Sequence, residues 1–166
     1  MTTGYLASAW SGFGEAVATA AAALAGLLFI AVSINLKRIL EFPSLPTRAA
    51  QTLIMFITPL IAALLVITPG QARIALAVEF LATGVTVAGV QLYLDLTAER
   101  GDEVTLWRRM IGAVFPAVFS SGCLVIAGAT LAARAGGGLY WLVPSVLAAI
   151  IFGLVNVWVL LVEILR

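Results

Sequence analysis

The sequence contains no histidine and a single cysteine, Cys123. Without histidine, the chain lacks the commonest metal ligand and the only side chain that titrates near neutral pH unaided. One cysteine excludes an internal disulfide. The run Ser120-Ser121-Gly122-Cys123 offers possible nucleophiles, but no histidine, and no lysine in a predicted membrane centre, can act as their base. We find no catalytic, cofactor-binding or metal-binding motif, and we expect a protein that is not an enzyme and binds no cofactor.

Charged residues are scarce as well: they make up 10% of the chain, and the formal net charge is +1. This balance creates no broad field that attracts nucleic acid, so we expect no nucleic-acid partner. Hydrophobic residues make up 63% of the chain, whereas soluble domains are roughly 45–50% apolar and about 25% charged. A soluble fold of this size could not hide the excess. We therefore expect the lipid bilayer to surround the chain.

The apolar residues form five long runs, separated by short breaks that are polar or contain glycine and proline. A bilayer core about 30 Å thick needs ~20 helical residues, whereas membrane strands need only ~10 and alternate apolar with polar residues. The runs are continuous and long enough for helices. We predict an all-α membrane protein, a single domain over residues 1–166 with five transmembrane helices at about 13–40, 49–68, 72–95, 110–133 and 139–165.

The basic residues divide unequally between the two sides of the predicted bundle. Only Arg73 and Arg134 fall on the side that holds the N-terminus. Short cytoplasmic loops carry the excess of lysine and arginine, so we expect the N-terminus outside, the C-terminus inside, and a multi-pass location in the cell inner (cytoplasmic) membrane. The opposite side receives the other seven of the nine basic residues: Lys37, Arg38, Arg48, Arg100, Arg108, Arg109 and Arg166.

Glu79 lies about seven residues into the third run. A carboxylate inside hydrocarbon usually faces a helix bundle, a cation or water. Arg73 and Arg134, both predicted on the outer side, are its possible ion-pair partners. Two interpretations fit: a proton or cation relay, and a packed ion pair or protonated carboxyl that holds helices together.

Three further polar residues follow Glu79 along the same run. Thr83 and Thr86 stand at i+4 and i+7, and Gln91 stands twelve residues on, roughly on the same side. We expect this polar stripe to face protein rather than lipid. It could line a narrow wet path in an oligomer or form hydrogen bonds between helices. Asn156, well inside the fifth run, is another candidate for such a bond.

Small residues recur in the spacing that lets membrane helices approach closely. In the first run, Ala22 and Gly26 form one small-xxx-small pair, and Ala21 and Ala25 form a second. We expect tight helix packing at these positions. Glycines in the third and fourth runs, Gly84, Gly89, Gly122 and Gly128, are expected to do the same.

Three segments carry a resemblance to a known group. They are Ala20–Leu40 (AAAALAGLLFIAVSINLKRIL), Arg48–Leu53 (RAAQTL) and Pro69–Gln71 (PGQ). They resemble small actinobacterial integral membrane proteins that are sometimes labelled modulators of the FtsH protease. The resemblance covers roughly the first 75 residues and assigns no functional residues.

Three hypotheses for function remain. The preferred one is a non-enzymatic membrane protein that acts through self-association, as a homo-oligomer, or as a subunit or regulator of a larger membrane complex. The alternative is a small homo-oligomeric channel or transporter whose pathway is lined by the polar stripe around Glu79. An enzyme acting on lipid is a third class, and it would require polar groups from different helices to converge near one interface.

Overall fold

The computed structural model describes residues 3–97 and 115–165, with side chains up to Val162. Every regular element in these residues is helical, which confirms the predicted all-α class. Five helices in the described part are long and apolar enough to cross a membrane. They are α1 (Ser11–Ile34), α3 (Ser44–Ile67), α4 (Arg73–Thr97), α6 (Phe115–Ala133) and α7 (Leu142–Leu165).

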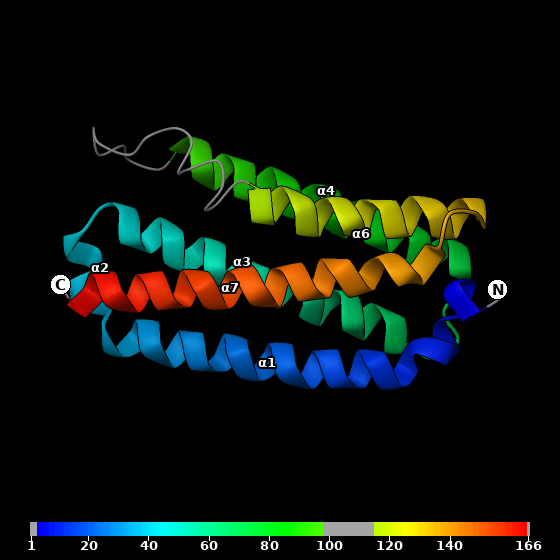
Figure 1. Ribbon diagram of the computed structural model, residues 1–166, viewed down its shortest axis with the longest axis horizontal. Coiled ribbons are helices and arrows are strands. Elements are labelled where there is room, and N and C mark those ends of the chain that lie inside the picture. The colour runs from blue at the N-terminus through cyan, green and yellow to red at the C-terminus, as the bar shows by residue number, and fades with distance from the viewer. Residues whose placement is uncertain (1–2, 98–114, 166) are drawn as a thin grey trace.

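The five long helices run alternately up and down, so the two termini lie at opposite ends of an elongated bundle (Figure 1). The N-terminal end also holds three short 3₁₀ helices, η1 (Thr3–Tyr5), η2 (Ala7–Trp10) and η4 (Gly138–Trp141). The opposite, C-terminal end holds the short helix α2 (Leu36–Glu41). The connections between α3 and α4 and between α6 and α7 are short, so the helices of each of these two pairs run in opposite directions.

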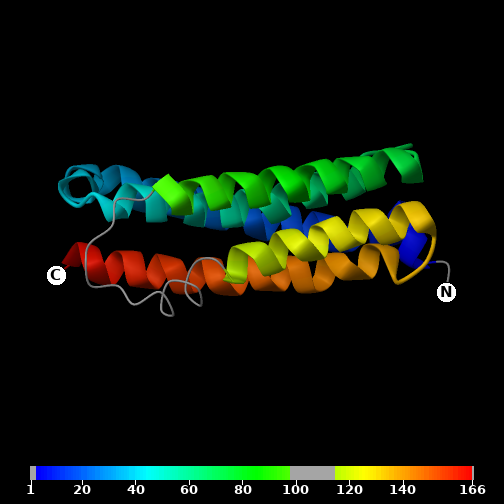
Figure 2. The ribbon, with the colours of Figure 1, turned by 90° about the horizontal axis from the view of Figure 1, so that it is seen from above.

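Four of the helices form a closed arrangement and the fifth lies outside it. Figure 2 shows α3 and α4 in one layer and α6 and α7 in the other. Around this square, α3 packs on α4, α4 on α6, α6 on α7 and α7 on α3. Helix α1 packs along α3 and touches α7 only slightly. As a result, α1 has one packed side, whereas α3 has three helical neighbours.

The first apolar run does not continue as one helix to residue 40. Helix α1 ends at Ile34, and Asn35 follows with φ −102° and ψ 15°. The Asn35 Nδ2 donates a hydrogen bond to the Ala31 carbonyl oxygen at 2.8 Å, a local bond of the kind that competes with helix continuation. Helix α2 then begins at Leu36, and its Ile39 is buried.

The other helix boundaries lie close to the predicted ones. Helix α3 begins at Ser44 rather than residue 49, with Pro46 in its first turn, where a missing N–H is least harmful. Helix α4 extends two residues beyond the predicted end, to Thr97. The predicted start of the fourth span at residue 110 lies outside the described residues, as do Arg100, Arg108, Arg109 and Arg166.

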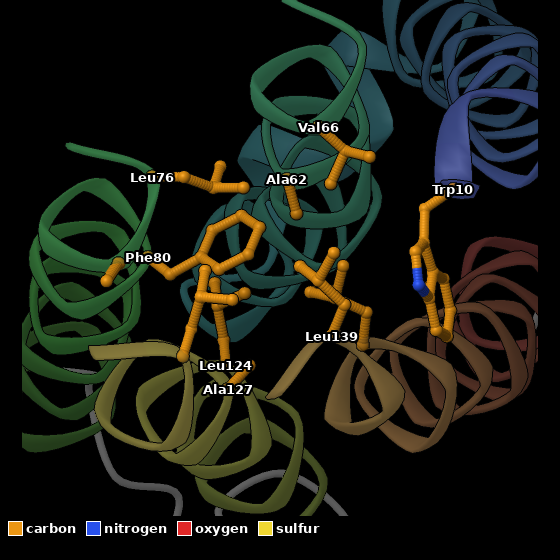
Figure 3. Packing of buried hydrophobic residues seen from close by; sticks show 11 residues of the cluster. Trp10, Ala62, Val66, Leu76, Phe80, Leu124, Ala127 and Leu139 are labelled. Atoms are coloured by element: carbon orange, nitrogen blue, oxygen red, sulfur yellow. The ribbon is translucent and has the colours of Figure 1, made fainter. Parts of the chain in front are cut away.

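The main apolar core lies inside the four-helix square, towards its N-terminal end. Figure 3 shows Phe80 pointing from α4 towards α3 and α6, beside Leu124 and Ala127 of α6. Phe80 and Leu124 are completely buried. Trp10, from the chain just before α1, closes the other side of this cluster beside Leu139. The core therefore joins all parts of the fold at this end.

Glycines allow α4 and α6 to approach closely, as the sequence predicted for two of them. A Cβ atom on Gly84 would lie 3.0 Å from the Ser121 carbonyl oxygen, and one on Gly128 would lie 2.7 Å from the Ala77 carbonyl oxygen. In contrast, nothing lies within 4 Å of the Cβ positions of three other glycines, Gly26, Gly89 and Gly122. Within the described chain, the prediction of close packing therefore does not hold at those three.

Candidate functional site

Glu79 forms a hydrogen bond with a residue that lies eight positions earlier in the chain. Its Oε2 accepts from Nε2 of Gln71, which lies in the turn before α4. Glu79 is half-buried, six residues after the start of α4. The Gln71 Oε1 is buried and has no hydrogen-bond partner among the described residues. The structure thus places Glu79 and Gln71 together near the N-terminal end of the bundle.

The two arginines that were expected beside Glu79 do not bond to it. Arg73 Nη1 donates to the carbonyl oxygens of Leu131 and, at 2.9 Å, of Ala132. These carbonyls lie in the last turn of α6, where a cation is stabilised by the helix dipole. Arg134 follows α6 with a φ of 55° and an exposed side chain. Neither arginine forms an ion pair with Glu79, although all three residues are described.

The predicted polar stripe does not form one interior face. Thr83 is half-buried and Thr86 is exposed, so the expectation that Thr86 faces protein is not met within a single chain. Gln91 is buried and faces α3. Gln91 faces a different direction from Glu79 because, at 3.6 residues per turn, their separation of twelve residues rotates the side chain by about 120° around the helix axis. The alternative of a channel formed by several copies stays a prediction.

Gln91 belongs to a second polar group, near the C-terminal end of the bundle. Its Nε2 donates to the backbone carbonyl oxygen of Gln51 on α3 at 3.1 Å. Both residues line a hollow together with Asp95, one turn further along α4. Its volume, measured for the centre of a water molecule, is about 20 Å³, which suits one small occupant. Apolar side chains complete the wall: Ala88, Leu92, Ala117 and Val118.

Sequence reasoning did not find the role of Gln51. Forty residues separate it from Gln91, and no periodic pattern connects positions on different helices. One signal was present, because an amide inside an apolar run needs a hydrogen-bond partner. This rule shows that Gln91 requires a partner, but it does not identify Gln51 as that partner.

Two serines join α6 and α7 by a reciprocal pair of hydrogen bonds. Ser120 Oγ donates to the Ser145 carbonyl oxygen at 3.0 Å, and Ser145 Oγ donates to the Ser120 carbonyl oxygen at 2.8 Å. Ser121 instead donates to the Ala117 carbonyl oxygen of its own helix. All three hydroxyl groups are buried and hydrogen-bonded, which indicates a packing role for the serine run. Ser145 was not identified from the sequence.

Asn156 makes a contact between helices, as its type suggested. Its Nδ2 lies 3.5 Å from the Met55 Sδ on α3, and the residue is half-buried. Pro59 stands four residues after Met55 and cannot donate to the Met55 carbonyl in the usual helical bond. Asn156 therefore lies beside the turn of α3 where proline removes one backbone hydrogen bond.

The residues from Thr3 to Trp10, here called the N-terminal clip, attach the start of α1 to the connection between α6 and α7. Trp10 Nε1 donates to the Thr3 carbonyl oxygen at 2.9 Å, and the Gly137 N–H donates to Tyr5 Oη at 3.2 Å. Gly138 has a φ of +60°, and a Cβ there would lie 2.3 Å from the Gly4 carbonyl oxygen. Glycine is thus required at this contact.

No group of three or more histidine, cysteine, aspartate or glutamate side chains in the described residues could hold a metal ion. The polar groups of the described chain instead form separate pairs: Glu79 with Gln71, Gln91 with Gln51, and Ser120 with Ser145. Comparison with protein-family models, with curated proteins and with solved structures finds no match to this chain.

Proposed function

We propose that the chain is a multi-pass protein of the cytoplasmic membrane, with its N-terminus outside and its C-terminus inside. Large apolar side chains cover the outer faces of the bundle, and the most exposed include Ile34 at 78% and Trp158 at 70%. Exposed apolar surface on this scale is unfavourable in water and favourable in hydrocarbon. Among the described residues, the three basic residues at the C-terminal end, Lys37, Arg38 and Arg48, outnumber the two at the N-terminal end, Arg73 and Arg134, which supports the orientation.

Within that membrane, we infer that the protein is not an enzyme and acts by association of copies through the outer side of α1. The observation that carries this proposal is the seam on that side, which consists of small residues at alternating spacings of four and three. All of its members are exposed: Gly12, Ala16, Thr19, Ala23 and Gly26.

The seam lies opposite the side of α1 that packs on α3. Gly14 marks the packed side, because its Cβ position is crowded by Ala63 and Ile67 of α3. Val17 and Ala21, three and seven residues later, are buried on the same side. At 3.6 residues per turn, the seam is rotated by about half a turn from them. Helix α1 thus has one occupied side and one free side.

Small residues favour association in lipid because they let two helix backbones approach and gain van der Waals contacts. An average spacing of 3.5 residues keeps them on one line along a left-handed helix pair. In the part of the chain that the structure describes, nothing lies within 4 Å of the Cβ positions of Gly12 and Gly26. Copies inserted in the same direction can bring two seams together about a two-fold axis normal to the membrane.

The test is energy transfer between labelled copies of the full chain in lipid vesicles, over a range of dilutions in lipid. We expect a concentration-dependent signal that Gly26→Ile weakens at least tenfold, which corresponds to about 1.4 kcal/mol. Gly89→Ile is the matched control, because Gly89 is also an exposed helical glycine with empty surroundings. A monomeric wild type, or an equal loss with Gly89→Ile, would contradict association through α1.

The seam also fits a transmembrane helix of another protein. The resemblance to proteins labelled modulators of the FtsH protease makes a membrane protease complex the first heterologous partner to test. Copurification from membranes, compared between the wild type and Gly26→Ile, would distinguish such a complex from self-association, because only the complex contains a chain of a different protein.

A further inference from the structure

Helix α1 contains one charged residue, Glu15, which lies four residues after the helix begins. The residue is exposed, and its carboxylate forms no hydrogen bond or ion pair with a described residue. The hydroxyl of Thr19, one turn further along, donates to the Glu15 backbone carbonyl oxygen at 2.9 Å, so its proton does not reach the carboxylate. The charge of Glu15 is thus compensated by no other side chain in the described residues.

The elements packed against α1 bring no charged group to this level of the helix. Around Gly14, the atoms that α3 contributes belong to Ala63, Val66 and Ile67, and η2 contains no ionisable residue. Helices α2 and α7 also contact α1, but they carry their ionisable residues at the opposite, C-terminal end of the bundle. The other described ionisable groups at the N-terminal end have different surroundings: Glu79 accepts from Gln71, Arg73 donates to α6, Arg134 is exposed after α6, Tyr5 accepts from Gly137, and Tyr140 bonds to Thr3.

Glu15 lies beside the small-residue seam on the outer side of α1. At 3.6 residues per turn, its side chain is rotated by about 60° from the middle of the seam. When two copies meet about a two-fold axis normal to the membrane, the two carboxylates lie at the same depth, one on each side of the contact. Each carboxylate then loses water where the second helix covers it. Burial of an unpaired charge is unfavourable, whereas a protonated carboxyl is neutral and can donate a hydrogen bond.

We propose that protonation of Glu15 controls association through α1, so that copies associate more tightly as the pH falls on the side of the membrane that holds the N-terminus. This inference rests on the proposed association and adds its regulation. Protonation favours association because only the charged form loses hydration and meets a second negative charge in the pair. The depth of Glu15 permits this control. The residue lies eight positions after the start of the 28-residue apolar span Ala7–Ile34, and because a bilayer core needs only ~20 residues, the carboxylate lies near the boundary with water.

The test is energy transfer between labelled copies of the full chain in phosphatidylcholine vesicles, at about pH 7.5 and about pH 4.5, because a glutamate side chain in water titrates near pH ~4.3. We expect association to be at least tenfold tighter at the lower pH. Glu15→Gln keeps the shape of the side chain and removes its charge, so we expect it to associate at both pH values as tightly as the wild type does at the lower one. Glu79→Gln is the matched control, because it removes a carboxylate of α4 at the same end of the bundle, and it is expected to keep the pH dependence.

The outcomes separate this inference from the association on which it rests. Equal association of the wild type at the two pH values would overturn control by Glu15 and leave association through α1 standing. A pH dependence that persists in Glu15→Gln would also overturn it, because another group would then bind the proton. A chain that stays monomeric at both pH values, as the wild type and as Glu15→Gln, would overturn the association itself and this inference with it.

Discussion

Two faces of the described bundle carry small residues, and one of the two packs against a helix of the same chain, whereas the other is exposed. Between α4 and α6, Gly84 and Gly128 lie against the backbone of the facing helix. On the outer side of α1, no other described residue lies within 4 Å of the Cβ positions of Gly12 and Gly26. In the most apolar stretch of α6, 50% of the residues are buried, whereas in the corresponding stretch at the start of the chain, which includes α1, 17% are buried.

The comparison shows that a pattern of small residues indicates where helices can approach closely, but not whether they do so within the chain. Small residues at a spacing of three or four show that a close approach is sterically possible. Whether it occurs within the chain depends on which helix lies opposite, and that is decided by the packing of all five helices. An unoccupied small-residue face in a folded chain is therefore a candidate contact with another chain.

The largest expected change in the free energy of unfolding separates two glycine-to-alanine variants, one at the packed face and one at the exposed face. In Gly128→Ala the new Cβ would lie 2.7 Å from the Ala77 carbonyl oxygen, and we expect a loss of about 3 kcal/mol of unfolding free energy from overpacking. In Gly26→Ala the methyl group meets no atom of another described residue within 4 Å, and alanine stabilises the helix by roughly 0.5–1 kcal/mol. Reversible unfolding in mixed micelles measures both. Similar losses in the two variants would remove the distinction between the faces.

The five long apolar helices of the described residues could be predicted from the sequence because each depends on one continuous stretch of chain. An apolar run of more than ~20 residues satisfies its backbone hydrogen bonds only as a helix in lipid. The same local reasoning fails at Asn35, where α1 ends early. There the Asn35 side chain and the Asn35 backbone N–H both donate to the Ala31 carbonyl oxygen, and hydropathy does not report such a side-chain bond.

The polar contacts could be predicted only in part, because each depends on two distant positions. Residue type correctly marked Gln91 and Asn156 as groups that bond between helices. It did not identify Gln51 or Ser145 as partners. Arg73 illustrates the same limit: charge suggested Glu79 as its partner, whereas its guanidinium reaches the end of α6, 58 residues away in sequence.

Two adjacent alanines of α1 sharpen the comparison further, since their side chains differ only in direction. Ala21 is completely buried on the side that packs on α3, and Ala22 is exposed. We expect Ala21→Leu to lower the unfolding free energy by about 2 kcal/mol, because three added carbons have no space. Ala22→Leu is expected to change it by less than about 0.5 kcal/mol. A larger loss in Ala22→Leu than in Ala21→Leu would mean that α1 packs through the other side.

The smallest effect tests whether polar side chains follow the same division between occupied and free faces. Ser145 on α7 bonds across to Ser120 on α6, whereas exposed Ser33 donates only to the Phe29 carbonyl oxygen of its own helix at 2.8 Å. Hydrogen bonds between membrane helices contribute about 0.6 kcal/mol on average. We therefore expect Ser145→Ala to lower the unfolding free energy by about 1 kcal/mol, since it also leaves the Ser120 carbonyl oxygen without this donor, and Ser33→Ala to leave it nearly unchanged. Each hydroxyl donates to a backbone carbonyl oxygen that alanine retains, so the double variant Ser120→Ala/Ser145→Ala should lose roughly the sum of the two single losses. No loss in either single variant would mean that shape, and not the reciprocal hydrogen bonds, holds α6 against α7.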